Sequence, residues 1–72
     1  LKAQYIVNSI VFKHKLSISF MKSVVVDNKV ILYGVADSPA VVEKAIEIAS
    51  EMVPDFAVES AISIVQDFKA YP

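Results

Sequence analysis

Two runs of β-branched residues joined by a short polar turn limit what this chain can fold into more than any other feature. The runs are Val24-Val25-Val26 and Val30-Ile31-Leu32-Tyr33-Gly34-Val35, and Asp27-Asn28-Lys29 separates them. β-branched residues favour strands, and Asn adopts positive φ at a small steric cost. The pattern predicts a β-hairpin with Asn28 and Lys29 at the centre of the turn and Asn28 at positive φ.

Both faces of this hairpin are expected to be apolar. In the expected register, Val25 lies opposite Leu32 on one face of the sheet. Val24 lies opposite Tyr33 on the other face. One layer of helices covers a single face, so the second face keeps an apolar patch that suits a partner. The residues expected on this exposed face are Val24, Val26, Ile31 and Tyr33.

A helix is expected before the hairpin. From Leu1 to about His14, apolar residues recur with a helical period. Lys13 and Lys15 flank the end of this helix, where cations complement the helix dipole. The segment from Leu16 to Phe20 alternates between apolar and polar residues, which indicates a short strand or an extended connection into the hairpin.

A second helix and a third strand are expected after the hairpin. Ser38 is a capping residue and Pro39 suits the first helical position. The helix that starts there is expected to run to about Met52, because Pro54 disfavours its continuation. Residues 58–66 read as a strand, which a right-handed crossover places parallel to the strand before the helix. The buried stripe expected on the helix is Val41, Val42, Ala45, Ile48, Ala49 and Met52.

Gly34 is the only glycine in the chain, and it lies inside an expected strand. Glycine costs about 0.5–1 kcal/mol relative to alanine at such a position. No second glycine forms a phosphate-binding loop with it. We expect Gly34 to mark a β-bulge or the close crossing of a helix over the sheet.

These elements predict an α+β fold, a small two-layer α/β sandwich in the order α-β-β-α-β. Its three-stranded mixed sheet is expected to carry two helices on one face. Residues 1–66 are expected to form a single domain, and residues 67–72 a tail or linker. The chain of 72 residues has no cysteine, so neither a disulfide nor a thiolate metal site compensates for its small core.

The composition argues against an enzyme. The chain has one histidine, no cysteine, no arginine and no clustered acid–base pair, so no catalytic, cofactor-binding or metal-binding residues are expected. Nucleic-acid binding is not expected either, because arginine and a Gly-x-x-Gly loop are absent. Only Tyr33 offers a strand aromatic on which a base could stack.

The charges are segregated along the chain. Residues 1–26 carry a charge of +4 and no acid, whereas the remaining residues carry −5. Such a dipolar surface orients a domain at an anionic membrane or in a head-to-tail stack of copies. Lysines beside exposed aromatic or sulfur-containing side chains suit a lipid headgroup interface, although helix-end electrostatics alone also explains those near residue 14. The residues expected to contact a lipid or partner are Lys13, Lys15, Phe20, Met21 and Lys22.

Several motifs between residues 24 and 65 follow the spacing of a known family. They are a Val-x-Leu-x-Gly strand at 30–34, an acid-Ser helix start at Asp37-Ser38, the helix positions Ala45 and Ile48-Ala49, and a last strand at 58–65. In this order they resemble the BON domain, a small module of osmotically induced, nodulation-type and other envelope proteins of bacteria. The resemblance covers over half of the chain.

The resemblance implies non-enzymatic binding to a phospholipid surface or to an envelope protein, without a cofactor. It also implies a periplasmic or cell-envelope location in a bacterium and a link to stress response. The alternative is a homo-oligomerisation module, in which the second sheet face or a sheet edge pairs with another copy to build a ring or filament. Asn28 and Asp55 depart from the family pattern, which usually has glycine in both turns.

Overall fold

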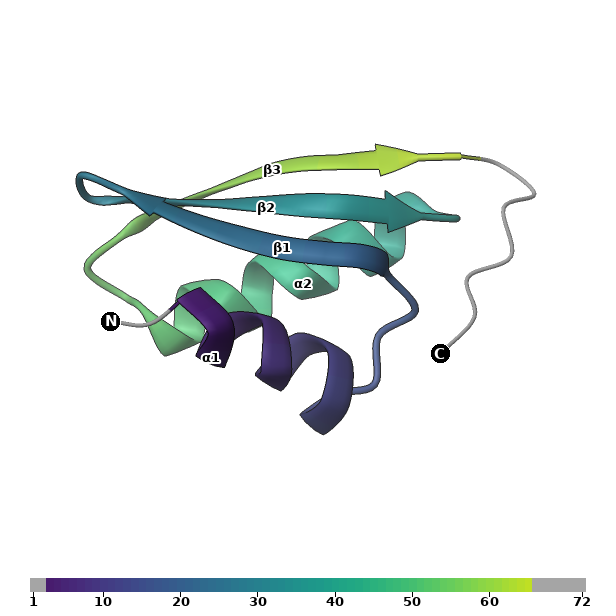
Figure 1. The fold of residues 1–72 in the computed structure, drawn as a ribbon, viewed down its shortest axis with the longest axis horizontal. Helices are drawn as coiled ribbons and strands as arrows, with labels where there is room; N and C mark the ends of the chain where they lie inside the picture. Colours follow the sequence, from purple (N-terminus) through teal and green to yellow (C-terminus); the bar gives the residue numbers. More distant parts are fainter. Residues whose placement is uncertain (1–2, 66–72) are drawn as a thin grey trace.

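The computed structural model describes residues 3–65, which form a sheet and, on one of its faces, a layer of helices (Figure 1). The elements are α1 (Ala3–Asn8), the π-helical η1 (Ser9–Lys13), β1 (Ser19–Val26), β2 (Lys29–Ala36), α2 (Pro39–Met52) and β3 (Ala57–Ile64). The strands lie in the order β1-β2-β3, with β2 antiparallel to β1 and parallel to β3. The expected α+β fold, its order α-β-β-α-β and its mixed sheet are confirmed. The expected tail, residues 67–72, lies outside the described residues.

The hairpin turns one residue earlier than the sequence predicts. Val26 pairs with Lys29, so Asp27 and Asn28 form the turn. Asp27, not Asn28, takes a positive φ, of +55. A short polar side chain makes this conformation tolerable for Asp as well as for Asn. The earlier turn leaves Lys29 inside β2, where its Nζ lies 3.5 Å from Oε1 of Glu59 on β3.

The pairing between the two hairpin strands is shifted accordingly. Val25 lies opposite Val30 rather than Leu32, and Val24 lies opposite Ile31. A slip by one residue would move each side chain to the other face of the sheet. The observed slip is by two residues, so every side chain of the hairpin keeps the face that the sequence predicts.

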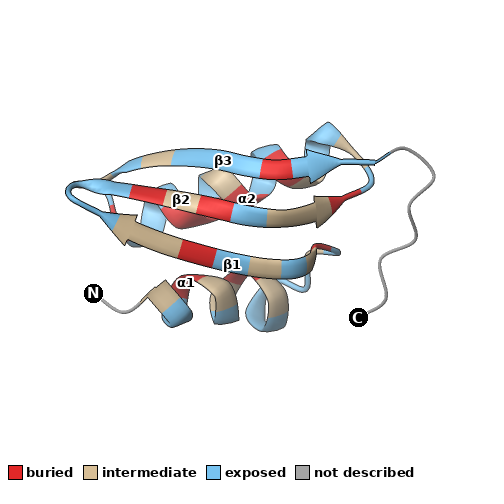
Figure 2. Ribbon diagram, turned by 45° about the horizontal axis from the view of Figure 1, so that its top comes forward, coloured by how far each residue is buried: buried red, intermediate tan, exposed pale blue. Residues whose placement is uncertain are grey.

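The core lies between the sheet and the helices (Figure 2). β2 supplies Val30 and Leu32, and the first helix supplies Ile6 and Ile10, all of them fully buried. Each such side chain contributes about 1.5–3 kcal/mol when it is fully buried. The other buried apolar residues are Ile18, Ala36, Val42, Ala45, Ile48, Ala49, Val53 and Ile62.

α2 begins and ends where the sequence predicts. Pro39 is its first residue and Ser38 its N-cap, although the Ser38 side chain makes no capping hydrogen bond. Most of the expected buried stripe is buried, but the prediction for Met52 is wrong, because this side chain is exposed. The helix ends at Met52, and Val53 takes the buried place while its N–H donates to Ala49 O at 3.0 Å.

The first helix is present but widens in its last turn. The N–H of His14 donates to Ser9 O at 2.9 Å, which is the hydrogen-bond spacing of a π-helix. The helix stops where Lys15 takes a φ of +55 and the N–H of Leu16 donates to Ile10 O at 3.1 Å. His14 is exposed at this end of the helix.

Ser23 of β1 holds the first helix against the sheet. Its side chain is buried, and its Oγ donates a hydrogen bond to Ala3 O at 2.7 Å. A buried hydroxyl without a partner costs about 1–3 kcal/mol. The bond thus favours the position of α1 beneath β1.

Gly34 lies at a β-bulge. β1 places both Phe20 and Met21 opposite the single Gly34, and the pairing register shifts between Ser19 and Lys22. The bulge is one of the two reasons expected for a glycine in this strand, and it is confirmed. The extra residue gives Phe20 a φ of +57, which is rare for a bulky side chain.

Gly34 also permits a close approach between β2 and the residues that precede the bulge in β1. A Cβ at this position would lie 2.6 Å from Ile18 Cγ2 and 3.0 Å from the backbone oxygen of Ser19. Its φ is +156, a conformation that L residues rarely adopt. Space and backbone geometry therefore both require glycine.

We expect Gly34→Ala to lower the free energy of unfolding by about 2 kcal/mol or more, because the methyl group collides with Ile18 and the backbone is strained. Urea denaturation followed by circular dichroism measures the loss. Ser63→Ala, at an exposed position of β3, is the control and should stay within about 0.5 kcal/mol of the wild type. An unchanged midpoint for Gly34→Ala would contradict the close approach.

Candidate interaction surfaces

The first third of the chain exposes three aromatic rings. Tyr5 is 60% exposed, Phe12 is 70% exposed and Phe20 is 82% exposed. Tyr5 and Phe12 lie two turns apart, on the side of the first helix away from its buried residues Ile6 and Ile10. Large apolar side chains that remain in water in one region of a small protein often mark an interaction site.

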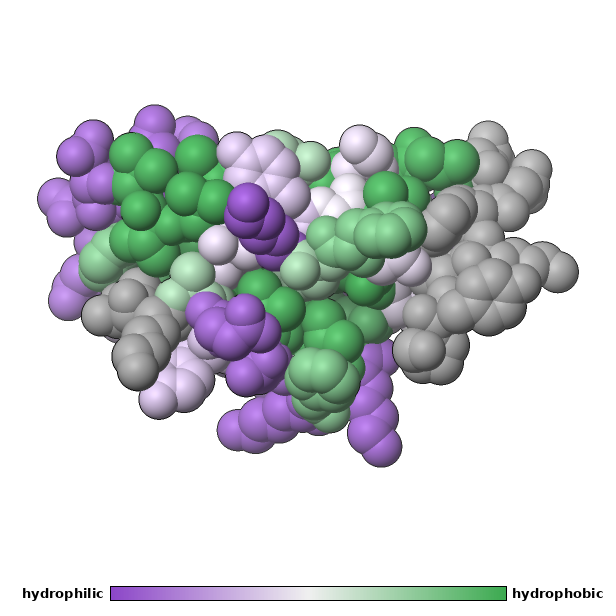
Figure 3. Space-filling view, viewed as in Figure 1, coloured by the Kyte–Doolittle hydropathy of each residue, from purple (hydrophilic) through white to green (hydrophobic). Residues whose placement is uncertain are grey.

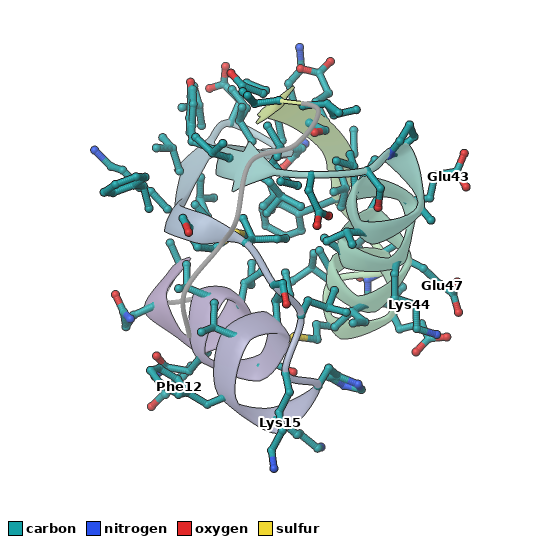
Figure 4. All side chains as sticks on the ribbon, turned by 90° about the vertical axis from the view of Figure 1, so that its right-hand side faces the viewer. Phe12, Lys15, Glu43, Lys44 and Glu47 are labelled. Atoms are coloured by element: carbon teal, nitrogen blue, oxygen red, sulfur yellow. The ribbon has the colours of Figure 1, made fainter. Side chains whose placement is uncertain are left out.

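Exposed lysines accompany these rings. Lys13 and Lys15 lie at the end of the first helix. Lys22, which was also expected to contact a lipid or partner, lies opposite Tyr33 on the other face of the sheet. Figure 4 shows Phe12 and Lys15 projecting at the same side of the molecule, away from the sheet. We name this set the basic-aromatic surface: Tyr5, Phe12, Lys13, Lys15 and Phe20.

The basic-aromatic surface was only partly predicted. Met21 was expected among the contact residues, but it is half-buried and packs against the core. Alternation along β1 explains this, because Met21, Ser23 and Val25 all point toward the helices. Tyr5 and Phe12 were missed, and the signal that could have found them is their position opposite the buried stripe of the first helix.

The second surface is the face of the sheet opposite the helices. Since Val30 and Leu32 point into the core, their neighbours Ile31 and Tyr33 point away from it. Figure 3 shows hydrophobic side chains at the hairpin end of the sheet, next to hydrophilic ones at the turn. We name this surface the open face. It comprises Lys22, Val24, Val26, Lys29, Ile31, Tyr33, Val35, Glu59, Ala61 and Ser63.

The four residues expected on an exposed sheet face all lie on the open face. Val26 and Tyr33 are exposed, whereas Val24 and Ile31 are half-buried. Val24 and Ile31 are opposite each other in the antiparallel pair, so each shields the other from water. The open face is therefore apolar but less exposed at its centre than at its ends.

Charges on the open face are few. The ion pair between Lys29 and Glu59 spans β2 and β3, and both side chains are about half exposed. Such a surface pair contributes about 0–1 kcal/mol. It therefore does little to stabilise the sheet. The other charge on the open face is Lys22, opposite Tyr33.

Within residues 3–65, no three His, Cys, Asp or Glu side chains come together as a group that could hold a metal ion. The helices of this part of the chain are also too short, or too polar, to cross a bilayer. The chain matches no model of a protein family, no curated protein and no solved structure.

We expect the strained residue of the basic-aromatic surface to lower stability. Phe20→Gly should raise the free energy of unfolding by about 0.5–1 kcal/mol, because glycine adopts a positive φ freely and the exposed ring loses little packing. Phe12→Gly, in a helical conformation, is the control and should lower the same quantity by about 1 kcal/mol. Thermal and urea denaturation measure both changes. A clear loss of stability for Phe20→Gly would show that its ring packs in solution.

Proposed function

We propose that this domain is a non-enzymatic binding module that attaches to an anionic phospholipid surface through the basic-aromatic surface. The observation that carries the proposal is the exposure of Tyr5, Phe12 and Phe20 within a stretch of chain that has lysines and no acids. Aromatic rings insert at the level of lipid headgroups, and lysines beside them bind the anionic charge.

The expected affinity is weak and reversible. Each lysine near an anionic membrane contributes about 1 kcal/mol. Full burial of a phenylalanine ring contributes about 1.5–3 kcal/mol, and a ring at the interface gains only part of that. Lys13 and Lys15 together with two or three rings therefore favour membrane association without fixing the domain there permanently.

The distribution of charge supports one orientation at the membrane. Figure 4 shows Glu43, Lys44 and Glu47 projecting from α2 on the side of the molecule away from α1. Lys44 Nζ lies 3.4 Å from Glu47 Oε1, so this pair is neutral and Glu43 leaves the three side chains with one net negative charge. An anionic surface attracts the first helix and the start of β1, and it repels the exposed side of α2.

The resemblance of residues 24–65 to the BON domain is consistent with this proposal. It adds the periplasm or cell envelope of a bacterium as the location, and it adds an envelope protein as the alternative partner. Under this proposal the domain attaches its parent polypeptide to the envelope and performs no chemistry.

Flotation with phospholipid vesicles tests the proposal. Wild-type protein is expected to float with vesicles that contain an anionic lipid such as phosphatidylglycerol, and to stay unbound with phosphatidylcholine alone. Bound protein should decrease as NaCl rises, because salt screens the lysines. No flotation with anionic vesicles at low salt, or equal flotation with neutral vesicles, would overturn the proposal and leave a protein partner as the alternative.

A matched pair of double variants separates the basic-aromatic surface from charge in general. Lys13→Gln/Lys15→Gln should lower the vesicle partition coefficient by about 10- to 30-fold, since each lysine contributes about 1 kcal/mol. Lys29→Gln/Lys44→Gln changes the net charge equally but lies outside this surface, and we expect it to bind like the wild type. An equal loss in both variants would mean that net charge alone drives the association.

A further inference from the structure

The outer edge of β3, on the side away from β2, presents backbone groups that do not bond to β2. Among residues 3–65, β3 pairs only with β2. The N–H of Ala57 donates to Asn28 O and the N–H of Val65 to Ala36 O, each at 2.9 Å, so these odd-numbered residues bond toward β2. Backbone groups alternate in direction along a strand. The N–H and C=O groups of the even-numbered residues 58–64 therefore point to the free edge.

A hydrogen bond within β3 satisfies one of these outward-pointing groups locally. The N–H of Ile62 donates to Oγ of Ser60 at 3.1 Å, two residues back in the same strand. A serine hydroxyl here takes the place that a carbonyl of a neighbouring strand usually occupies. The strand itself is largely exposed (Figure 2).

The two edges of the sheet differ in how readily a further strand can pair with them. On the β1 edge, the bulge at Phe20 and Met21 interrupts the strand, and the charged side chain of Lys22 follows it. Bulges and lysines are features that discourage the addition of another strand. β3 pairs with β2 without interruption over all eight of its residues and contains no proline, glycine or lysine. Its edge is open to a further strand.

We propose that the β3 strands of two copies of this chain pair in antiparallel fashion about a two-fold axis at Ala61, which joins two sheets into one of six strands. With Ala61 opposite its equivalent, all even-numbered residues from 58 to 64 form hydrogen-bonded pairs. This register makes about eight hydrogen bonds between the copies. It uses every outward-pointing backbone group of the strand.

The side chains of β3 are self-complementary in this register. On the helix side, Val58 of one copy lies opposite Ile64 of the other, and it covers a side chain that is 47% exposed in the single chain. On the open face, Ala57 lies opposite Val65, which is 45% exposed. Glu59 lies opposite Ser63, so the strands bring no like charges directly together.

The pairing also brings the exposed side of one α2 toward that of the other. Glu43 and Glu47 project from α2 on the side away from α1 (Figure 4), and α2 packs more against β3 than against β2. The repulsion between these acidic side chains of the two copies opposes association at low salt and is screened at about 0.5 M NaCl, where the Debye length is a few ångströms.

The interface between the two copies is small, so association is expected at protein concentrations of about 10 µM to 1 mM. This proposal does not depend on lipid binding, and either can fail alone.

Sedimentation velocity in about 0.5 M NaCl tests the dimer. The wild type should shift from monomer to dimer over the stated concentration range, and a monomer at every concentration would overturn the proposal.

Ala61→Glu and Ala61→Lys each place like charges at the axis and should each remain monomeric. A 1:1 mixture of the two variants should restore the dimer, whereas a mixture that stays monomeric would contradict an axis at residue 61. Ser17→Glu, at an exposed position before β1 and therefore at the other edge of the sheet, controls for added charge and should still dimerise.

Single cysteines test the register, because the chain has none of its own. Ala61→Cys places two thiols opposite each other across the axis, and it should form a disulfide-linked dimer under mild oxidation. Ser63→Cys lies on the same strand and face but opposite Glu59 of the second copy, so it should cross-link at least about tenfold more slowly. Equal rates for the two variants would overturn the register.

Discussion

β2 is apolar on both of its faces, and the two short helices cover only one of them. Val30 and Leu32 are fully buried against the helices, whereas Ile31 and Tyr33 point to the open face. The same strand therefore anchors the core and leaves apolar surface outside it. The sheet is also only three strands wide, so the parallel strand β3 ends it with unpaired backbone groups among the described residues. Because the helices cover one face of a narrow apolar sheet, the domain buries a core on that face. The open face and the outer edge of β3 stay exposed.

The contact at Gly34 links this core to the basic-aromatic surface. Ile18 is buried and approaches the backbone of β2 at the one position without a side chain. The register between β1 and β2 shifts directly after this contact, and Phe20 in the bulge is exposed at a positive φ. Strain of about 1–2 kcal/mol at an exposed aromatic residue persists only where the surrounding packing imposes it. In this domain, packing inside the core thus determines which ring is exposed at the surface.

The elements that could be predicted from the sequence depend on local backbone preferences. α2 was predicted at both ends because capping and proline geometry act within a few residues. The faces of the hairpin were predicted because alternation survives a two-residue slip, but the turn was not, since Asp27 and Asn28 tolerate positive φ almost equally. The exposure of Phe20 as a strained bulge residue depends on Gly34 meeting Ile18, which lies outside β2 and far from it in sequence. The lysines of the basic-aromatic surface were predicted from charge segregation, whereas its helical aromatics, Tyr5 and Phe12, were missed although they lie opposite the buried stripe of the first helix.

The measurement that tests the membrane-binding account most directly is the fluorescence of a single tryptophan in place of Phe12. The chain has no tryptophan of its own, so Phe12→Trp reports only the surroundings of that side chain. Ala40→Trp, at the exposed start of α2, is the matched control. The account predicts that anionic vesicles shift the emission of Phe12→Trp to shorter wavelength, as its indole leaves water, while Ala40→Trp stays unchanged. An unchanged emission at position 12 with vesicles in excess, or an equal shift at both positions, would contradict it.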